Sequence, residues 1–333
     1  IVKRILTQGN KKKKAIGVEM ASGEKIMAKR VISNADPEVT YRKLVGENNL
    51  SKNLIKKLNR TKYSCTSLML FLTVDMDLKA AGLDSGNIWV VPNQDLDELY
   101  ASMMAKDISS GEDFPAMFIS CPTIKDPTSF DGKYHTLEVV TFISHESFEP
   151  FNNEAKRKSQ EYLNYKELLT TKVLHGLEKV VPGLSNHIVQ KELGTPLTNE
   201  HYINTTNGSV YGTEKTIKQI GPMSFQSRSE IQGLYLCGAS VLSHGVAGAT
   251  FSGVQTAARI LGCKQKDLLQ ADDSQKLRVY DAESDTEFPE EVLKKIRLRQ
   301  RKVKAVEKLD EFTVKIAYPD GWEDYSELMV KEG

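Results

Sequence analysis

Alternating apolar and polar positions open the chain and predict short β-strands. The alternating runs are IVKRIL, AIGVEM and KIMAKRVISNA, and turn-forming residues separate them, QGNKKKK after the first and ASGE after the second. Consecutive strands joined by tight turns favour a three-stranded meander. The third run ends at Ser33-Asn34-Ala35-Asp36-Pro37, where small residues and a proline close a strand, so we place a domain boundary at residues 36–42.

The middle of the chain predicts a second region of strands and helices. Residues 36–59 favour short helices with polar breaks, and half-buried antiparallel strands are expected at CTSLMLFLTVD, GNIWVVP, FPAMFISCP and HTLEVVTFISH. Helical spacing of apolar residues predicts two helices, one at DLDELYASMMAKDI and one over residues 153–181. No internal repeat is evident.

A short apolar strand followed by glycines and a helix occupies residues 231–261. Leu234 to Cys237 reads as a buried parallel strand, and Gly245, Gly248 and Gly253 lead into an uninterrupted helical pattern that ends at Leu261. Small residues at Ala249, Gly253, Thr256 or Ala257 would let this helix lie close against a sheet. Such a strand, glycine turn and helix form half of a dinucleotide-type unit, with free N–H groups at the helix start.

Composition places the protein among ordinary globular proteins. Its 333 residues are 40% hydrophobic and 27% charged, which allows two domains. No apolar run approaches the ~20 residues of a membrane-spanning helix, and no secretory leader opens the chain. The four cysteines, Cys65, Cys121, Cys237 and Cys263, occur singly, so we expect a reducing, cytoplasmic compartment and no zinc or disulfide framework.

The charge is unevenly distributed along the chain. The net charge is +1, yet residues 1–62 hold 16 basic and 5 acidic residues. A concentration such as Lys11 to Lys14 suits phosphates or an anionic membrane surface, and the alternative is a solvated hairpin tip. Nucleic acid is not expected, because no aromatic residues interleave with the basic ones. The histidines show no ligand spacing, so we expect no metal site.

Two motifs carry a resemblance to a known family. The segment GLYLCGASVLSHGVAGATFSGVQTAARIL resembles the "GLYLxG" strand and "GxxGAxxSG" helix of flavoproteins of the phytoene desaturase, carotenoid isomerase and retinol saturase type. The upstream run GVEMASGEKIMAKRVISNADP resembles the "GVxxxxGxxxxAxxVVSNADP" stretch of the same family. Both motifs stand in the family's order, roughly 200 residues apart. The resemblance covers residues 1–263.

The resemblance implies an α/β protein, α+β overall: a partial FAD/NAD(P)-binding, Rossmann-like domain with an inserted mixed-sheet substrate domain. Residues 1–40 are then the middle of the FAD domain, 41–215 the substrate domain, 216–263 the strand and helix that close the FAD site, and 264–333 a charged extension. The family's GxGxxG turn is missing from this chain. We therefore expect a carboxy-terminal portion of such a protein, inactive by itself and lacking the segment that grips the adenosine diphosphate of FAD.

The resemblance also implies which residues contact the cofactor. Gly238 and Ala239 would lie beside the ribityl and phosphate part of FAD. Gly245, Val246, Ala247 and Gly248 would direct N–H groups at the pyrimidine edge of the flavin, where a positive helix end stabilises a reduced, anionic ring. Ser33, Asn34 and Ala35 would pass the cofactor. For each glycine the alternative is a tight turn without ligand contact.

His244 is the titratable side chain in the glycine loop. An imidazole that titrates near pH 7 can move a proton during saturation or isomerisation of a polyene, so His244 is a candidate catalytic acid or base. The alternative is a loop residue that only forms hydrogen bonds.

The family's substrate is a polyene, a carotenoid or retinoid, which needs an apolar tunnel more than charged catalysts. The candidate lining residues are Met69, Phe71, Trp89, Met117, Phe118, Phe142 and Ile143 from the predicted strands, with Tyr211 in the approach to the flavin. Alternation with period two cannot separate a tunnel wall from a sheet packed on helices, so ordinary core positions remain the alternative for each.

Two other functions remain open, an amine-oxidase-like flavoenzyme and a cofactor-free binding or assembly domain.

Past Cys263 the resemblance stops. A charged helix is expected over residues 290–310 and a strand near DEFTVKIAY, and this extension could dock on the main body or mediate formation of a homo-oligomer. Collecting a water-insoluble substrate would favour peripheral contact with a membrane.

Overall fold

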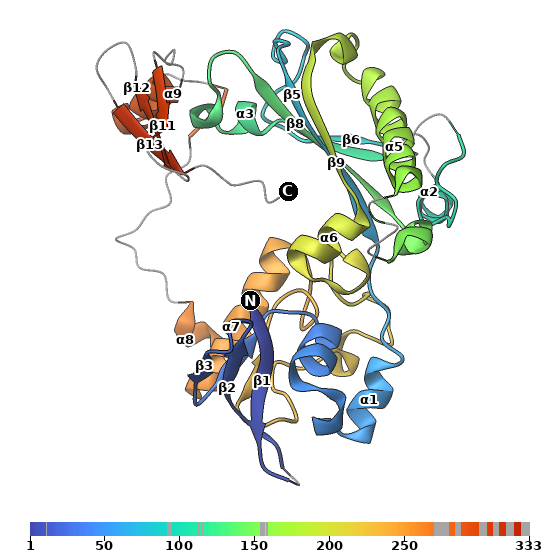
Figure 1. Cartoon of the computed structure of the whole chain (residues 1–333), viewed down its shortest axis with the longest axis vertical. Coiled ribbons are helices and arrows are strands. Elements are labelled where there is room, and N and C mark those ends of the chain that lie inside the picture. The colour runs from blue at the N-terminus through green and yellow to red at the C-terminus, as the bar shows by residue number, and fades with distance from the viewer. Residues whose placement is uncertain are drawn as a thin grey trace.

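Two lobes make up the protein in this computed structural model (Figure 1). The structure describes residues 1–10, 12–91, 95–111, 114, 116–153, 157, 159–269, 280–283 and 288–297, and the backbone of 298–299, 305–308, 313–317 and 323–327. The lower lobe combines the amino-terminal strands and the helices that follow them with the glycine-rich segment of residues 231–261, and the upper lobe contains the strands and helices of residues 66–194. The two family-like motifs therefore meet in one lobe.

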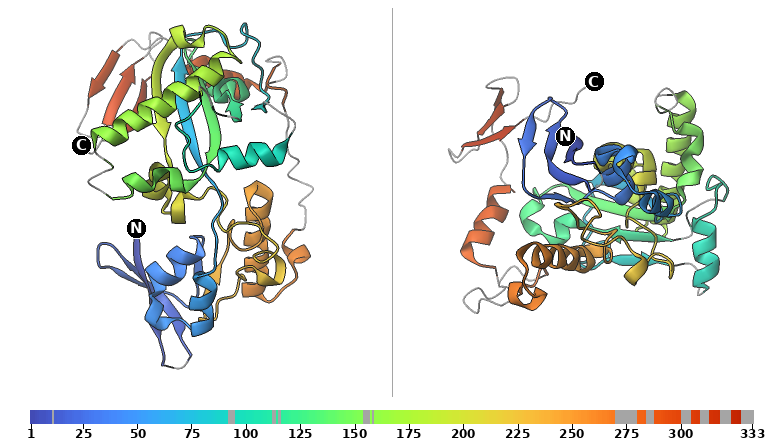
Figure 2. Two further views of the ribbon diagram at one scale, coloured as in Figure 1. Left: turned by 90° about the vertical axis from the view of Figure 1, so that its right-hand side faces the viewer. Right: turned by 90° about the horizontal axis from the view of Figure 1, so that it is seen from below.

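The lower lobe contains the predicted meander and the predicted parallel strand. Strands β1 (Val2–Gln8), β2 (Lys14–Met20) and β3 (Lys25–Met27) form an antiparallel sheet in that order. Strand β4 (Val31–Ser33) pairs in parallel with β10 (Leu234–Leu236), and α7 (Gly245–Leu261) follows. Figure 2 shows the meander and α7 on opposite sides of this lobe.

The core of the lower lobe corrects one predicted boundary. Helical segments η1 (Glu38–Val45), η2 (Glu47–Asn49) and α1 (Lys52–Leu58) follow β4. Their apolar side chains share one core with both sheets; its buried residues are Ile5, Ala15, Tyr41, Val45, Leu54, Leu58, Phe225, Ile231, Leu234, Leu236 and Val241. Residues 41–58 thus belong to this lobe and not to the substrate domain, because their apolar faces pack under β4 and β10.

Two chain segments connect the lobes and run side by side. The N–H of Val210 donates to the carbonyl of Cys65 at 3.1 Å, and the N–H of Ser64 donates to the carbonyl of Gly212 at 2.9 Å. The crossing therefore lies at residues 62–65 and 210–214. Between it and the sheets lie the short elements α6 (Pro196–Ile203), η6 (Thr206–Gly208) and η7 (Gly221–Met223).

The upper lobe is built on a five-stranded sheet. Its strands are β5 (Thr66–Val74), β6 (Ile88–Val90), β7 (Met117–Ser120), β8 (His135–Ile143) and β9 (Ile188–Gly194), in the order β6-β7-β8-β5-β9. Every pairing within it is antiparallel, so the sheet is not mixed in strand direction as the substrate domain was expected to be. The helix and strand content predicted for this region is confirmed.

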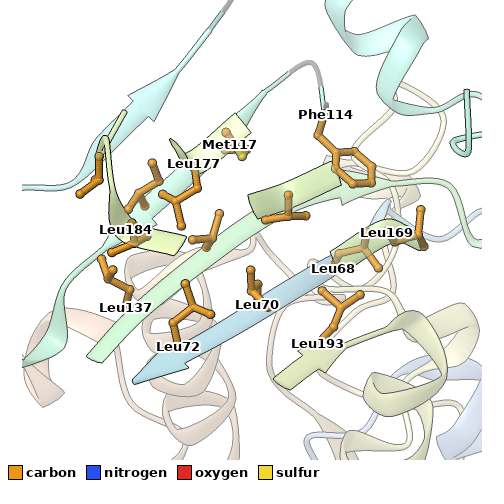
Figure 3. Close-up of a cluster of buried hydrophobic side chains, with 14 of the residues drawn as sticks. Leu68, Leu70, Leu72, Phe114, Met117, Leu137, Leu169, Leu177, Leu184 and Leu193 are labelled. Atoms are coloured by element: carbon orange, nitrogen blue, oxygen red, sulfur yellow. The ribbon is translucent and has the colours of Figure 1, made fainter. Parts of the chain in front are cut away.

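One face of this sheet is closed by the long helix α5 (Gln160–Glu178). Leu68, Leu70 and Leu72 of β5 project into a core that includes Leu169 and Leu177 of α5, and Figure 3 shows these side chains meeting. The hydroxyl of Ser159 caps α5 by accepting the N–H of Tyr162. The remaining short elements around the sheet are α2 (Leu96–Met103), α3 (Pro122–Lys125), η3 (Pro127–Ser129), η4 (His145–Phe151) and η5 (Leu184–His187).

The carboxy-terminal extension docks on the upper lobe. Helix α8 (Gln265–Leu268) ends the lower lobe, and α9 (Glu290–Arg299) lies beside η3. Strands β11 (Ala305–Lys308), β12 (Thr313–Ala317) and β13 (Glu323–Glu327) form an antiparallel sheet. The helix expected over residues 290–310 therefore ends near 299, because the pattern at 305–308 pairs with β12 instead. In the described part of the chain, no helix combines the length and apolar character that crossing a bilayer requires.

Candidate cofactor and substrate site

The carboxyl ends of β4 and β10 bring residues 33–35 and 238–239 together. The N–H of Cys237 donates to the carbonyl of Ser33 at 3.0 Å. Gly238 has φ +95°, and a Cβ at this position would lie 2.2 Å from Oδ1 of Asn34. Only glycine suits this backbone and this close approach. Two of the predicted cofactor segments thus form one small-residue edge.

Polar side chains of α7 hold it against this edge. The N–H of Gly238 donates to Oγ of Ser252 at 2.8 Å, and Oγ1 of Thr256 donates to the carbonyl of Leu236 at 2.8 Å. The expected small-residue face is wrong at Gly253, where a Cβ would meet open space. Helix α7 is held against β10 by the hydroxyl groups of Ser252 and Thr256, and the pattern of small residues did not predict these hydrogen bonds.

The start of α7 faces solvent beside that edge. Gly245, Val246 and Ala247 are exposed, and the exposed fraction of Val246 is 89%. A Cβ at Gly248 would lie 2.6 Å from the carbonyl carbon of Ser243, so glycine lets the loop close tightly on the helix. The first four N–H groups of a helix have no partner within it. This predicted segment therefore presents accessible N–H donors and the positive end of a 17-residue helix.

His244 stands at the N-cap of α7 and joins an aromatic cluster. Its ring centroid lies 4.5 Å from that of Tyr211, which lies 5.7 Å from that of Phe142. Burial raises the pKa of Tyr211, so its hydroxyl stays protonated at neutral pH. Gly212 has φ +68°, and a Cβ there would lie 2.4 Å from Oγ of Ser240, so the chain after Tyr211 passes close to the glycine loop.

Phe142 continues this cluster onto the face of the upper sheet opposite α5. Register places Met69 opposite Val140, Val140 opposite Phe118, and Phe118 opposite Trp89, all on one face. The rings of Trp89 and Phe118 meet edge to face with centroids 4.8 Å apart. Trp89 is 63% exposed and Phe71, on the same face, is 41% exposed. The structure thus gathers Met69, Phe71, Trp89, Phe118 and Phe142 on a single open face.

Two of the candidate lining residues are wrong. Met117 is 3% exposed and Ile143 is fully buried, and both belong to the core under α5. Each directly neighbours a residue of the open face, Phe118 or Phe142. Successive side chains of a strand point to opposite faces, so both members of such a pair cannot line the same wall.

Within the cofactor segment Ser33 faces inward and Asn34 outward. Oγ of the buried Ser33 lies 2.7 Å from Oγ1 of Thr40, which fixes the turn into η1. Asn34 is exposed and Ala35 is half-buried. Of the three predicted residues, Asn34 is therefore the one whose side chain is available to a ligand.

Asp36 was missed as a site residue although it joins the two lobes. Its buried carboxylate accepts the N–H of Thr206 at 2.7 Å and the N–H of Val39 at 3.0 Å. The hydroxyl of Tyr63 donates to it at 3.3 Å. Burial, together with this carboxylate, raises the pKa of Tyr63. Asp36 belongs to the SNADP motif, which did single out this segment. Its partner Thr206 is 170 residues away, so no local sequence pattern could predict their hydrogen bond.

Comparison with known proteins identifies relatives over most of the chain. The chain is 30% identical over 260 residues to an all-trans-retinol 13,14-reductase of Danio rerio and 31% identical over 273 residues to a chloroplastic prolycopene isomerase of Daucus carota. These alignments cover 74% and 80% of this chain but 42% and 40% of the relatives. The chain thus spans about two-fifths of the length of these relatives. No protein-family model matches it.

Solved structures give a partial likeness. An oxidoreductase from Methanosarcina mazei aligns with 78% of this chain and 48% of its own, with a TM-score of 0.48 and 14% identity. A putrescine oxidase bound to putrescine aligns with 77% of this chain and 47% of its own, with the same TM-score and identity. The sequence relationship is the firmer finding, and it confirms the resemblance of the two motifs: this chain is a relative of the all-trans-retinol 13,14-reductases and prolycopene isomerases.

Proposed function

We propose that this chain provides the substrate face and the flavin-facing helix of an FAD-dependent enzyme that saturates, desaturates or isomerises C=C bonds of a polyene. One observation carries the proposal. Aromatic side chains extend from Trp89 and Phe118 on the open sheet face to Phe142, Tyr211 and His244 at the start of α7. A long apolar substrate lying along this face would bring its double bonds to the predicted flavin site. The names of the relatives, a retinol reductase and a prolycopene isomerase, support this substrate class.

The residues present fit the predicted flavin. Gly238 lets the carboxyl end of β10 pass directly against Asn34, because any larger side chain at 238 would collide with Asn34. The exposed first turn of α7 offers N–H groups to an electron-rich ring edge, a contribution of about 0.3–1 kcal/mol or more if desolvated. FAD would supply the two-electron chemistry. Pyrophosphate contacts of the usual glycine-rich turn are not expected from this chain.

His244 is the proposed acid or base of the site. Its imidazole contacts the ring of Tyr211 at an interplanar angle of 34°, at the N-cap of α7. In this place its imidazole could deliver a proton to a substrate carbon or remove one. Tyr211 would orient the ring.

Tryptophan fluorescence tests substrate binding without any flavin. Trp89 lies on the open face, and replacing Trp322, which is outside the described residues, with Phe leaves it as the single tryptophan. Retinol absorbs where tryptophan emits, so retinol bound on this face should quench Trp89. We expect saturable quenching that weakens about tenfold in Phe142→Ala. Leu163→Ala is the control: Leu163 is a half-exposed apolar residue of α5, on the other side of the sheet, and its replacement should leave the quenching of Trp89 unchanged.

The two alternatives predict different results. Putrescine does not absorb where tryptophan emits, so its binding is measured by calorimetry, and binding of putrescine but not of retinol would favour an amine-oxidase-like function. Absence of binding by both, in a protein shown by circular dichroism to be folded, would contradict a substrate face and favour an assembly role. Titration with FAD, followed by the visible spectrum of bound flavin, measures the cofactor site separately. The same titration in Gly238→Val should lose any binding seen, because the side chain would displace Asn34 and part the edge that the two residues form.

A further inference from the structure

A groove of about 990 Å³ lies on the lower lobe between α1 and the loop of residues 213–225, and it contains none of the residues assigned above to the cofactor or substrate. Six of its lining residues are basic and none is acidic; the basic ones are Lys56, Lys57, Arg60, Lys62, Lys215 and Lys218. Within the described residues, no carboxylate lies within ion-pair distance of any of them. Such an uncompensated cluster attracts anions.

Two of these lysines are built into the floor of the groove. Nζ of Lys57 donates to the carbonyl of Ser224 at 2.8 Å and lies 4.4 Å from the ring centroid of Phe225. Nζ of Lys215 donates to the carbonyls of Ala239 at 2.6 Å and Thr213 at 3.0 Å. Burial lowers the pKa of both amines. Their positions are therefore set by the fold, and an anion in the groove would favour their charged form.

Apolar side chains project beside the charges. Ile217 is 88% exposed and Met223 is 61% exposed, both on the loop that forms one wall. Gln219 anchors this loop: its side chain accepts the N–H of Lys62 at 2.7 Å and donates to the carbonyl of Lys62 at 3.0 Å. The exposed apolar residues are thus held in place next to the basic groove.

From these observations we propose that this face docks on a bilayer containing anionic phospholipids, with a phosphate headgroup in the groove and Ile217 and Met223 in the interfacial layer. Basic residues beside exposed apolar ones suit a surface that is negative outside and apolar beneath. Free phosphate would satisfy the charges but leave the exposed isoleucine and methionine without a role.

The location differs from the basic hairpin that the sequence suggested. Lys12 and Lys13 lie in the β1–β2 connection and Lys14 begins β2, whereas α1 lies elsewhere on the lower lobe (Figure 1). Lys11 itself lies outside the described residues. Lys215 and Lys218 follow Lys56 and Arg60 by more than 150 residues in the sequence, so only folding brings the four side chains together.

The test compares two matched double variants of the full chain. Lys56→Gln with Arg60→Gln neutralises the groove, and Lys12→Gln with Lys14→Gln neutralises the hairpin; all four side chains are exposed. Binding is measured by co-sedimentation with vesicles of phosphatidylcholine alone or in equal parts with phosphatidylserine. At about 1 kcal/mol for each basic residue near the surface, the groove variant should bind the mixed vesicles about 30-fold more weakly. The hairpin variant should change less than threefold.

Two further measurements distinguish the lipid from soluble phosphate. Ile217→Ser with Met223→Ser should weaken binding to mixed vesicles about tenfold while leaving the charges intact. Soluble glycerophosphoserine at millimolar concentration should not displace the protein. Displacement by it, binding that ignores phosphatidylserine, or an equal loss in the hairpin variant would each overturn the proposal. Retinol quenching of Trp89 in the groove variant should match the unmodified chain, so failure here is separate from failure of the proposed function.

Discussion

The two faces of the upper sheet come from the same strands but have opposite environments. On one face Leu68, Leu70 and Leu137 are fully buried under α5. On the other, residues one position along each strand include Trp89 and Phe71, which stay 63% and 41% exposed. The open face also carries polar side chains, because Glu138 and Glu192 stand on either side of Phe71 in the register, so its aromatic residues are exposed among polar ones.

The difference separates stability from binding. Burial of the first face supplies the hydrophobic free energy of this lobe, at roughly 25 cal/mol per Å². Exposed aromatic side chains gathered on one face do not contribute in this way, and contiguous exposed apolar patches usually mark interaction sites. Their connection to Tyr211 and His244 aligns the open face with the predicted flavin site.

The largest effect should come from adjacent residues on opposite faces. Leu70→Ala opens a cavity in the closed core and should lower the free energy of unfolding by about 2–5 kcal/mol. Met69→Ala, on the half-buried open face, should lower it by about 1 kcal/mol or less. Urea unfolding of both variants measures these changes. Equal losses of unfolding free energy would contradict the difference between the closed and the open face.

Next, Phe118→Ala should affect binding more than stability. It removes an edge-to-face partner of Trp89, and such pairs contribute about 0.5–1.5 kcal/mol. We expect roughly fivefold weaker retinol binding, followed by the fluorescence of retinol itself because the change also alters the surroundings of Trp89. Unchanged affinity would remove Phe118 from the proposed substrate face.

A smaller, opposite effect is expected from Gly194→Ala. A Cβ at this position would lie 3.5 Å from the carbonyl oxygen of Met69 and 3.7 Å from the ring of Phe71, both ordinary contacts. Because φ is not positive there, the substitution should raise the free energy of unfolding by about 0.4–1 kcal/mol. A loss of stability in urea unfolding would mean that this strand edge cannot accept a methyl group.

The smallest effect concerns pH and His135, whose side chain is buried against Phe130 and bonded to Thr123 at 2.9 Å. Burial lowers the pKa of His135 below its usual value near 6.5. The unfolded chain then binds the proton more readily, so this group's contribution to stability is complete above about pH 6.5 and declines as the pH falls below it.

His135→Asn should flatten the decline in stability between about pH 7 and pH 5 relative to the unmodified chain. Urea unfolding at several pH values measures it, and His201→Asn, an exposed position on α6, serves as the control. If both variants keep the slope of the unmodified chain, His135 does not contribute to it.

Local patterns were sufficient for most elements and for the cofactor edge. Alternation predicted the meander and the strands of the upper sheet, and the glycines at 238 and 248 occupy close approaches that only glycine fits. The order of the two motifs predicted that residues 33–35 and 238–239 would meet, which the pairing of β4 with β10 confirms. The contacts of a bound flavin and of His244 remain predictions.

Period-two alternation specifies that Phe118 and Met117 point to opposite faces, but it carries no information about which face a helix will cover. That depended on where α5 packs, and it moved Met117 and Ile143 into the core. Packing likewise assigned residues 41–58 to the lower lobe, joined Asp36 to Thr206 and formed the basic groove from two segments, residues 53–62 and 213–225. Backbone geometry depends on neighbouring residues, so the sequence pattern predicts it. The burial of apolar side chains and the clustering of charges depend on contacts between segments that are far apart in the sequence, so only the tertiary structure determines them.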